Sequence, residues 1–237
     1  MKAVSFSVAV TICAIFIKNL FMQSILKLIT LSIFCLFSFF CKAQVAVKEI
    51  GTSISSDTAF VNLREYSTDF VYDMKYASSD NFLNAKVYDC AECFLRLKTV
   101  KALILANNEF MKQGLRIKLF DCYRPLDIQK KMWEIVSNPK YVADPAKGSI
   151  HNRGGAIDIT LVDINGNELD MGTKFDFFGI EASHAYARLP QKVKDNRKLL
   201  KKIMIAKQFN SFDSEWWHYN LKAGLTDAVS NEKWECN

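Results

Sequence analysis

A change of hydrophobic period at Gly114 is the feature that most restricts how this chain can fold. Before this glycine, apolar residues recur at helical spacing: Leu97, Val100, Leu103, Ile104, Phe110 and Met111. The spacing predicts an amphipathic helix over about residues 96–113, which the glycine ends. Directly after it, Leu115, Ile117 and Leu119 alternate with other residues, which is typical of a strand. The pattern therefore requires a helix and a strand in one fold.

Later segments continue this mixture. Pro125 is suited to the first position of a helix, which we expect to reach about Ser137, and a surface helix is predicted over residues 191–207. Alternation predicts strands at 156–161 and 216–221. The intervening residues predict a loop at 138–147, a turn at 165–167 and an irregular N-terminal arm at 44–60. The predicted class is α+β, with helices packed on a small, mostly antiparallel sheet.

The first 43 residues differ from the rest in charge and hydropathy. They hold four lysines and no acidic residue, and residues 28–40 are largely apolar. This pattern predicts a signal peptide cleaved near Ala43, leaving a domain of residues 44–237 in an exported, periplasmic protein. Three alternatives stay open: Met22 as the true start, lipidation of Cys41, and an uncleaved anchor.

Charge argues against a nucleic-acid partner. The net charge of +6 belongs mostly to the leader, because 27 basic residues remain beyond it against 25 acidic ones. No basic face of the kind that binds nucleic acid is indicated. We also expect no stable membrane association once the leader is removed.

Four cysteines follow the leader: Cys90, Cys93, Cys122 and Cys236. An even number in an exported chain permits disulfides. Cys90 and Cys93 have the spacing of half a zinc site, but no second such pair follows. We expect Cys93 or Cys90 to bond to Cys122, which would tie the segment before the first helix to the loop that carries Arg124.

Two of the three histidines have neighbours that suit metal chemistry. His151 precedes Gly154-Gly155, where the backbone can bend sharply, and Asp158 follows on the predicted strand. His218 comes three residues after Glu215. Two histidines and an aspartate can hold a catalytic zinc and leave a position open to water. His184 has no such neighbours and is interpreted as a non-ligand.

Two further residues suit catalysis of peptide hydrolysis. A carboxylate beside the metal, Glu215, could accept the proton of an attacking water. To face the metal, it must lie at the irregular beginning of its strand. Arg124, at a strand-to-helix junction, could stabilise an oxyanion. Taken singly, each motif also has a structural explanation: a chance His and Asp pairing, an aromatic core cluster around His218, or a surface ion pair of Arg124.

Together, these motifs resemble the D-alanyl-D-alanine dipeptidase family of zinc metallopeptidases. The resemblance runs from about Phe70 to Tyr219. It also includes Asp73-Met74-Lys75-Tyr76-Ala77, Asn81-Phe82 and Met171-Gly172-Thr173-Lys174-Phe175-Asp176-Phe177. It implies the hedgehog/D-Ala-D-Ala metallopeptidase fold and hydrolysis of a small dipeptide.

The resemblance also implies residue roles. His151, Asp158 and His218 would bind one zinc ion per chain, Glu215 would act as general base and acid, and Arg124 would stabilise the tetrahedral intermediate. In a small closed pocket, Asp176 would pair with the substrate ammonium, while Ser149 and the Tyr76 region would meet the carboxylate end. The chain departs from the family around residues 85–93, where Cys90 and Cys93 occupy a stretch expected to shape the pocket wall.

Two other functions remain as alternatives. A D,D-carboxypeptidase or endopeptidase acting on peptidoglycan would need an open cleft, whereas Phe175-Asp176 would block the amine side of the pocket. A non-catalytic zinc-binding module would need neither Glu215 nor Arg124.

Overall fold

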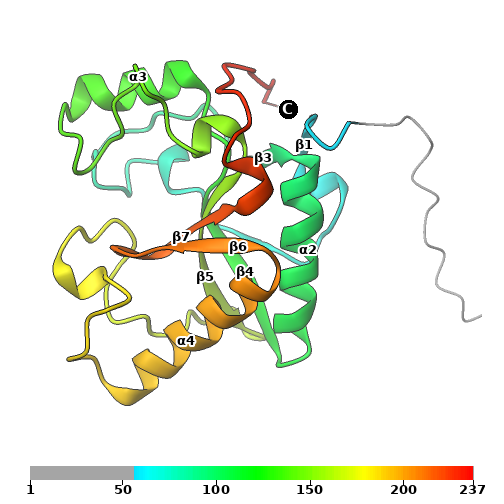
Figure 1. Cartoon of the computed structure of the whole chain (residues 1–237), viewed down its shortest axis with the longest axis vertical. Helices are drawn as coiled ribbons and strands as arrows, with labels where there is room; N and C mark the ends of the chain where they lie inside the picture. Colours follow the sequence, from blue (N-terminus) through cyan, green and yellow to red (C-terminus); the bar gives the residue numbers. More distant parts are fainter. Residues whose placement is uncertain (1–55, 237) are drawn as a thin grey trace, which may run out of the picture. The chain divides into compact units, whose positions relative to one another are not determined.

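A five-stranded sheet lies at the centre of the computed structural model, which describes residues 56–236 (Figure 1). The predicted leader, residues 1–43, lies outside the described residues. The strand order is β2 (Val71–Tyr72), β4 (Leu115–Asp121), β5 (Ala156–Asp163), β7 (Glu215–Leu221) and β6 (Phe209–Phe212). β2 runs parallel to β4, and the other neighbours are antiparallel. The α+β class with a small, mostly antiparallel sheet is confirmed.

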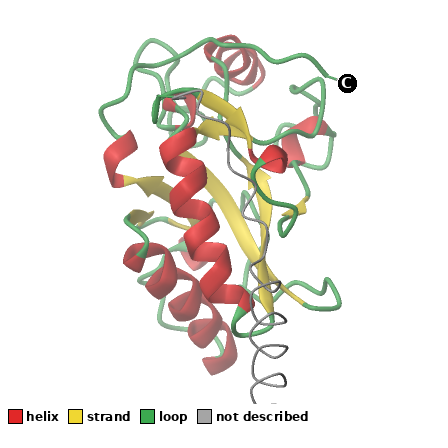
Figure 2. Cartoon of the chain, turned by 90° about the vertical axis from the view of Figure 1, so that its right-hand side faces the viewer, coloured by secondary structure: helices red, strands yellow, loops and turns green. Residues whose placement is uncertain are grey.

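The three predicted helices are all present. α2 (Leu97–Met111) and α4 (Gln191–Ala206) contact each other and cover one face of the sheet (Figure 2), and α3 (Leu126–Ile135) follows Pro125. Gly114 adopts a φ of +70° at the end of α2, a left-handed conformation that glycine adopts without a steric penalty. The described part of the chain also contains five short 3-10 helices: η1 (Leu63–Glu65), η2 (Lys75–Ala77), η3 (His151–Arg153), η4 (Ile180–Ala182) and η5 (Lys222–Gly224).

β5 is the central strand of the sheet, and its residues are buried on both faces. Ile157, Ile159 and Leu161 point into the main core, where they join buried residues of α2 and α4. Each such side chain stabilises the fold by about 1.5–3 kcal/mol. On the other face, Asp158 and Thr160 are also buried. This arrangement places a carboxylate on a rigid, water-excluding part of the sheet.

The sequence did not predict the strands of two to four residues, which include β2 and β6 of the central sheet. β1 (Phe60–Asn62) and β3 (Phe94–Arg96) pair in a separate two-stranded sheet. β1 begins at Phe60, the last residue of the expected irregular arm, so that expectation was wrong at Phe60 alone. Strands of three residues are too short for alternation to be recognised, and their pairing depends on partners distant in sequence.

Two disulfides cross-link segments of the chain that are distant in the sequence. Cys93 bonds to Cys122, which confirms one of the two expected pairings, and Cys90 bonds to Cys236. Trp234, close to the second disulfide, stacks on Phe94 with ring centroids 4.9 Å apart. The C-terminal segment is thus fixed against the segment that precedes α2.

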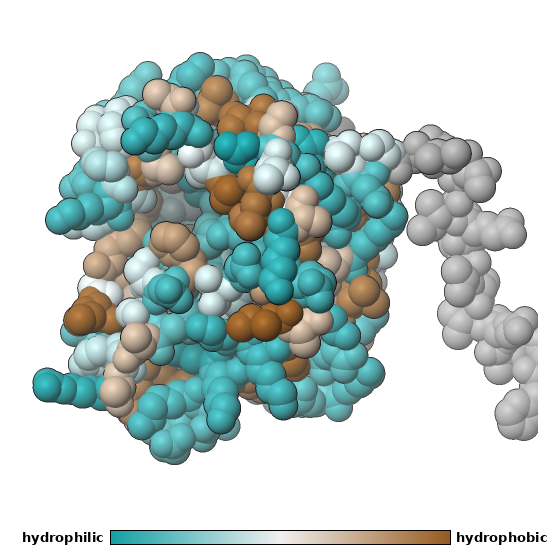
Figure 3. Space-filling view, viewed as in Figure 1, coloured by the Kyte–Doolittle hydropathy of each residue, from teal (hydrophilic) through white to brown (hydrophobic). Residues whose placement is uncertain are grey.

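Within residues 56–236, no helix has both the length and the apolar character needed to cross a membrane. On the face shown in Figure 3, hydrophobic residues lie scattered among hydrophilic ones.

Candidate metal centre and substrate pocket

Three potential metal ligands meet where β5 pairs with β7. Asp158 lies opposite His218 in the strand register, and His151 comes from η3, just before β5. His218 Nδ1 is 2.9 Å from Asp158 Oδ1 and 3.3 Å from His151 Nε2. One donor atom from each residue lies within 4.8 Å of the other two. Antiparallel pairing therefore brings the second histidine to the first His and Asp pair.

Gly154 makes the turn that brings His151 and Asp158 to one point. Its φ is +72°, and a Cβ at this position would overlap the ring of Phe60 and the side chain of Arg96. Glycine alone fits both the conformation and the space. The sharp bend expected at Gly154-Gly155 is confirmed.

The outward nitrogen of each histidine is hydrogen-bonded to an oxygen. His151 Nδ1 donates to the Cys122 carbonyl at 2.7 Å, and His218 Nε2 donates to Asn220 Oδ1 at 2.9 Å. With these protons directed outward, the inward nitrogens present lone pairs to each other and to Asp158. A cation stabilises such an arrangement, and outer hydrogen bonds of this kind orient metal ligands. Two imidazoles and one carboxylate therefore fit a metal site.

The electrostatics of His151, Asp158 and His218, called the triad below, favour a positive charge between these side chains. Burial alone would raise the pKa of Asp158, but the two histidines outweigh it and hold this pKa below its ordinary 3.8. Burial likewise opposes charging of His218, yet the hydrogen bond to Asp158 raises the pKa of His218 above 6.5. A proton or a metal cation can supply the positive charge that these shifts favour.

Glu215 lies beside the triad without joining it. It begins β7, where the pairing with β6 shifts register between Ser211 and Phe212. This irregularity allows Glu215 and His218 to face the same pocket although they are three residues apart, as expected. Glu215 Oε2 is 3.9 Å from His218 Nδ1. Burial raises the pKa of Glu215 above its ordinary 4.5, the direction that suits a carboxylate that accepts a proton.

Arg124 is held rigidly at the pocket. Its guanidinium is only 7% exposed and donates to Asp121 Oδ2 at 2.6 Å and to Gln129 Oε1 at 2.9 Å. Tyr88 donates from its hydroxyl to the other Asp121 oxygen at 2.7 Å. Sequence reasoning missed Asp121, Gln129 and Tyr88. The signal for Asp121 was its position three residues before Arg124 in the same motif.

All eight residues singled out in the sequence line one cavity of about 280 Å³. They are His151, Asp158, His218, Glu215, Arg124, Ser149, Tyr76 and Asp176. Neither Cys90 nor Cys93 lines this cavity, so the expectation that these cysteines shape its wall was wrong. Their sulfurs are engaged in disulfides instead.

Tyr76 and Asp176 are joined directly. The Tyr76 hydroxyl donates to Asp176 Oδ2 at 3.0 Å. This contact places Tyr76 at the Asp176 side of the cavity, whereas the resemblance implied the carboxylate side. Burial and the neighbouring Asp158 raise the pKa of Asp176 well above its ordinary 3.8. A cationic group of a substrate would stabilise the ionised form of this buried carboxylate.

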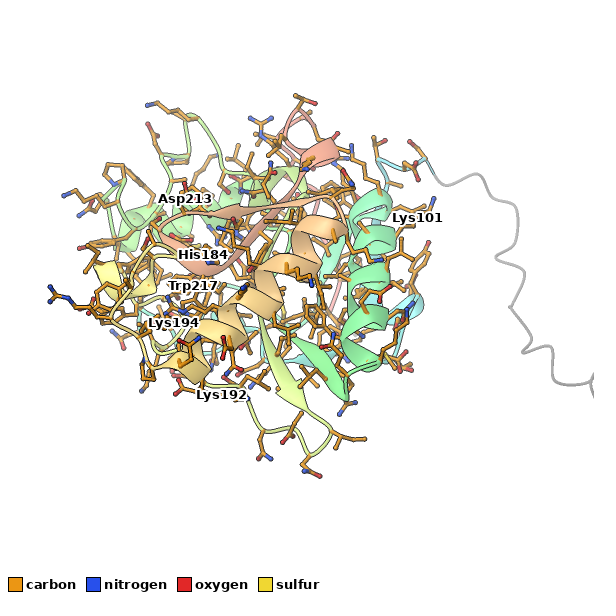
Figure 4. All side chains as sticks on the ribbon, turned by 60° about the horizontal axis from the view of Figure 1, so that its bottom comes forward. Lys101, His184, Lys192, Lys194, Asp213 and Trp217 are labelled. Carbon is orange, nitrogen blue, oxygen red and sulfur yellow. A yellow bond between two sulfur atoms is a disulfide. The ribbon has the colours of Figure 1, made fainter. Side chains whose placement is uncertain are left out.

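His184 lies away from the triad, as the sequence indicated. Its backbone N–H donates to the carbonyl of Asp213 near the β6–β7 turn (Figure 4), and its ring lies 6.4 Å from that of Tyr219. Burial, with help from the cations Lys201 and Arg197, lowers the pKa of His184 from 6.5 to about 4.

This shift predicts a loss of stability in acid. In the unfolded chain His184 is protonated with a pKa near 6.5, whereas in the folded chain its pKa is about 4. The stability that neutral His184 contributes is therefore complete above pH 6.5 and decreases as the pH falls from 6.5 towards 4. We expect His184→Gln to flatten the fall of Tm across this interval, measured by calorimetry beside the unaltered protein. Equal slopes for the two proteins would contradict the prediction.

Comparisons with known proteins identify the family of this chain. Residues 56–234 match the family described as D-ala-D-ala dipeptidase. The chain is 36% identical over 184 residues to a D-alanyl-D-alanine dipeptidase of Escherichia coli, covering 77% of this chain and 95% of that protein. Proteins of the same name from Enterococcus faecium and Enterococcus faecalis are each 30% identical, covering 64% and 70% of this chain and 85% and 92% of those proteins.

The match covers the whole central sheet, the metal triad, Glu215 and Arg124. A match of this extent goes beyond a shared local motif. The chain is therefore a peptidase that belongs to the D-Ala-D-Ala dipeptidase family.

Proposed function

We propose that this protein hydrolyses D-alanyl-D-alanine to two molecules of D-alanine, with one zinc ion held by His151, Asp158 and His218. The observation that carries the proposal is the convergence of this triad with Glu215 and Arg124 on one small cavity. The names of the relatives support the choice of substrate.

The triad suits zinc because three protein ligands leave a position open for chemistry. When bound, the metal supplies a Lewis acid, which acidifies water and polarises a carbonyl oxygen. The role of the protein is to hold His151, Asp158 and His218 in fixed orientation through the hydrogen bonds to Cys122 and Asn220.

Glu215 and Arg124 carry the proton and charge changes of the reaction. Glu215 accepts a proton from the attacking water and returns one to the leaving amine as the peptide C–N bond breaks. The Arg124 guanidinium donates hydrogen bonds to the oxyanion that forms on the carbonyl oxygen. Because Asp121 and Gln129 already fix this guanidinium, little reorganisation accompanies the step.

The remaining side chains suit a zwitterionic dipeptide. Asp176, supported by Tyr76, provides an anion for the ammonium group, and Ser149 provides a hydroxyl for the carboxylate end. A buried carboxylate at the amine side disfavours substrates in which that nitrogen is acylated, as it is within a longer peptide. This feature favours a dipeptidase over an enzyme that cleaves intact peptidoglycan.

Metal removal tests the proposal directly. We expect purified protein to release D-alanine from D-Ala-D-Ala, to lose this activity on treatment with a chelator, and to regain it on addition of one equivalent of zinc. Metal content measured by mass spectrometry should approach one zinc per chain and should fall in His218→Ala. Cleavage of muropeptides in place of the free dipeptide would contradict the substrate assignment and favour the carboxypeptidase alternative.

We also propose that the domain is exported to the periplasm after cleavage near Ala43. The support comes from the apolar leader and from the disulfides Cys90–Cys236 and Cys93–Cys122, because such bonds persist in oxidising compartments. Sequencing the N-terminus of protein recovered from the periplasmic fraction would test both points.

A further inference from the structure

The segment that carries Asp176 is attached to α4 at both of its ends. At the first end, Arg197 Nε donates to the Met171 carbonyl at 2.7 Å, and Asn196 Nδ2 donates to the Asp170 carbonyl at 2.8 Å. At the second end, Arg197 Nη1 donates to the Ser183 carbonyl at 3.1 Å. One side chain of the helix thus bridges two points of the chain that flank residues 172–182. In Figure 1 this segment, in yellow, runs beside α4.

Arg197 makes these bonds from a buried position. It is 5% exposed, and it donates to the carbonyl oxygens of Met171 and Ser183. These carbonyl oxygens and the nearby Asp170 favour its charge, although Nη2 is buried without a hydrogen-bond partner. Bonds from a charged donor are about twice as strong as neutral ones. The guanidinium is suited to this task because its planar fork directs several donors at once, which a lysine ammonium on a flexible stem does not reproduce.

Between these attachments, Phe175 packs against Phe120 and Trp217, and Tyr76 donates a hydrogen bond to Asp176. A cavity of about 350 Å³, lined by Thr160, Gly172 and Phe175, lies against it, and another of about 460 Å³ is lined by Phe82, Phe175 and Asp176. Open space nevertheless adjoins Phe175 in both cavities, so these contacts do not enclose the segment completely. Asp176 also has a φ of +58°, a conformation that non-glycine residues rarely adopt without support from their surroundings.

We propose that Arg197 is a positioning residue for substrate recognition: it fixes both ends of the 170–183 segment and thereby holds Asp176 where the substrate ammonium binds. This inference rests on the role proposed above for Asp176. Arg197 itself does not line the catalytic cavity. Its effect should therefore fall on recognition of the free amine and not on the chemical step.

Arg197→Lys is the informative variant, because it retains a buried cation while losing the planar fork. Lys198→Ala, at an exposed position on the same helix, is the matched control. For each protein, kcat and KM would be measured for D-Ala-D-Ala and for N-acetyl-D-Ala-D-Ala, together with zinc content and Tm. Asp176→Asn measures how much amine recognition depends on Asp176.

We expect Arg197→Lys to raise KM for D-Ala-D-Ala about tenfold, equivalent to about 1.4 kcal/mol, with kcat changed by less than about twofold. Its preference for the free amine over the N-acetyl dipeptide should narrow, while zinc content stays unchanged and Lys198→Ala behaves as the unaltered protein. Asn196→Ala, which removes the third attachment, should shift KM in the same direction.

Two results would overturn this inference while the proposed function stands. One is an unchanged KM and amine preference in Arg197→Lys; the other is a loss of kcat, zinc and Tm together, which would indicate a purely structural role. If Asp176→Asn retains the full preference for the free amine, the proposed role of Asp176 itself fails, and the inference fails with it. Absence of hydrolysis by the unaltered protein would instead refute the proposed function.

Discussion

Replacing Glu215 by glutamine is expected to abolish most of the peptidase activity while leaving the metal in place. Glutamine retains the size of the side chain but cannot accept the proton of the attacking water. Loss of a general base of this kind lowers kcat by about 10²–10⁴-fold. The metal should remain because the three ligand atoms come from His151, Asp158 and His218, and Glu215 only approaches His218 at 3.9 Å.

The measurement is kcat for D-Ala-D-Ala together with zinc content and Tm in the same preparation. Glu168→Gln is a suitable control, because Glu168 is a half-exposed surface carboxylate paired with Lys118. If Glu215→Gln kept normal kcat, the base would have to be another group. If it lost its zinc, Glu215 would instead contribute to the metal site.

The sequence identified the site residues better than it identified their supports. His151, Asp158, His218 and Glu215 stand in local patterns whose chemistry can be recognised one segment at a time. Asp121 was overlooked because its importance depends on Tyr88, which reaches it only after folding. Asn220 was overlooked for a different reason: it lies only two residues after His218, but its bond to that ring depends on the tautomer.

For the fold, long periodic elements were predicted and short paired ones were not. α2 buries one face and β5 buries both. In each element the buried apolar residues recur at a regular spacing that is visible in the sequence. The pairing of β5 with β7, which places Asp158 opposite His218, cannot be read from either segment alone. The sequence did require an irregular start of β7 for Glu215 to face the metal, and the register shift beside Phe212 satisfies that requirement.

Replacing Arg124 by lysine is expected to lower kcat by about 10²–10³-fold, the loss typical of a removed oxyanion donor. Lysine keeps the positive charge near Asp121 but cannot donate to Asp121, Gln129 and an oxyanion in one plane. Because the charge on the substrate oxygen develops only in the transition state, KM should change much less than kcat.

The lysine variant is more informative than Arg124→Ala. Alanine would leave the fully buried Asp121 carboxylate without its partner, and breaking a buried pair in this way costs about 3–5 kcal/mol of stability. Arg64→Lys provides the control, because Arg64 is a half-exposed arginine paired with Glu92, and neither residue lines the catalytic cavity. A folded, zinc-containing Arg124→Lys protein with normal kcat would show that Arg124 serves the structure of the pocket and not the transition state. A selective fall in kcat would instead assign the oxyanion to this guanidinium, and would explain why Asp121, Gln129 and Tyr88 are devoted to holding it in place.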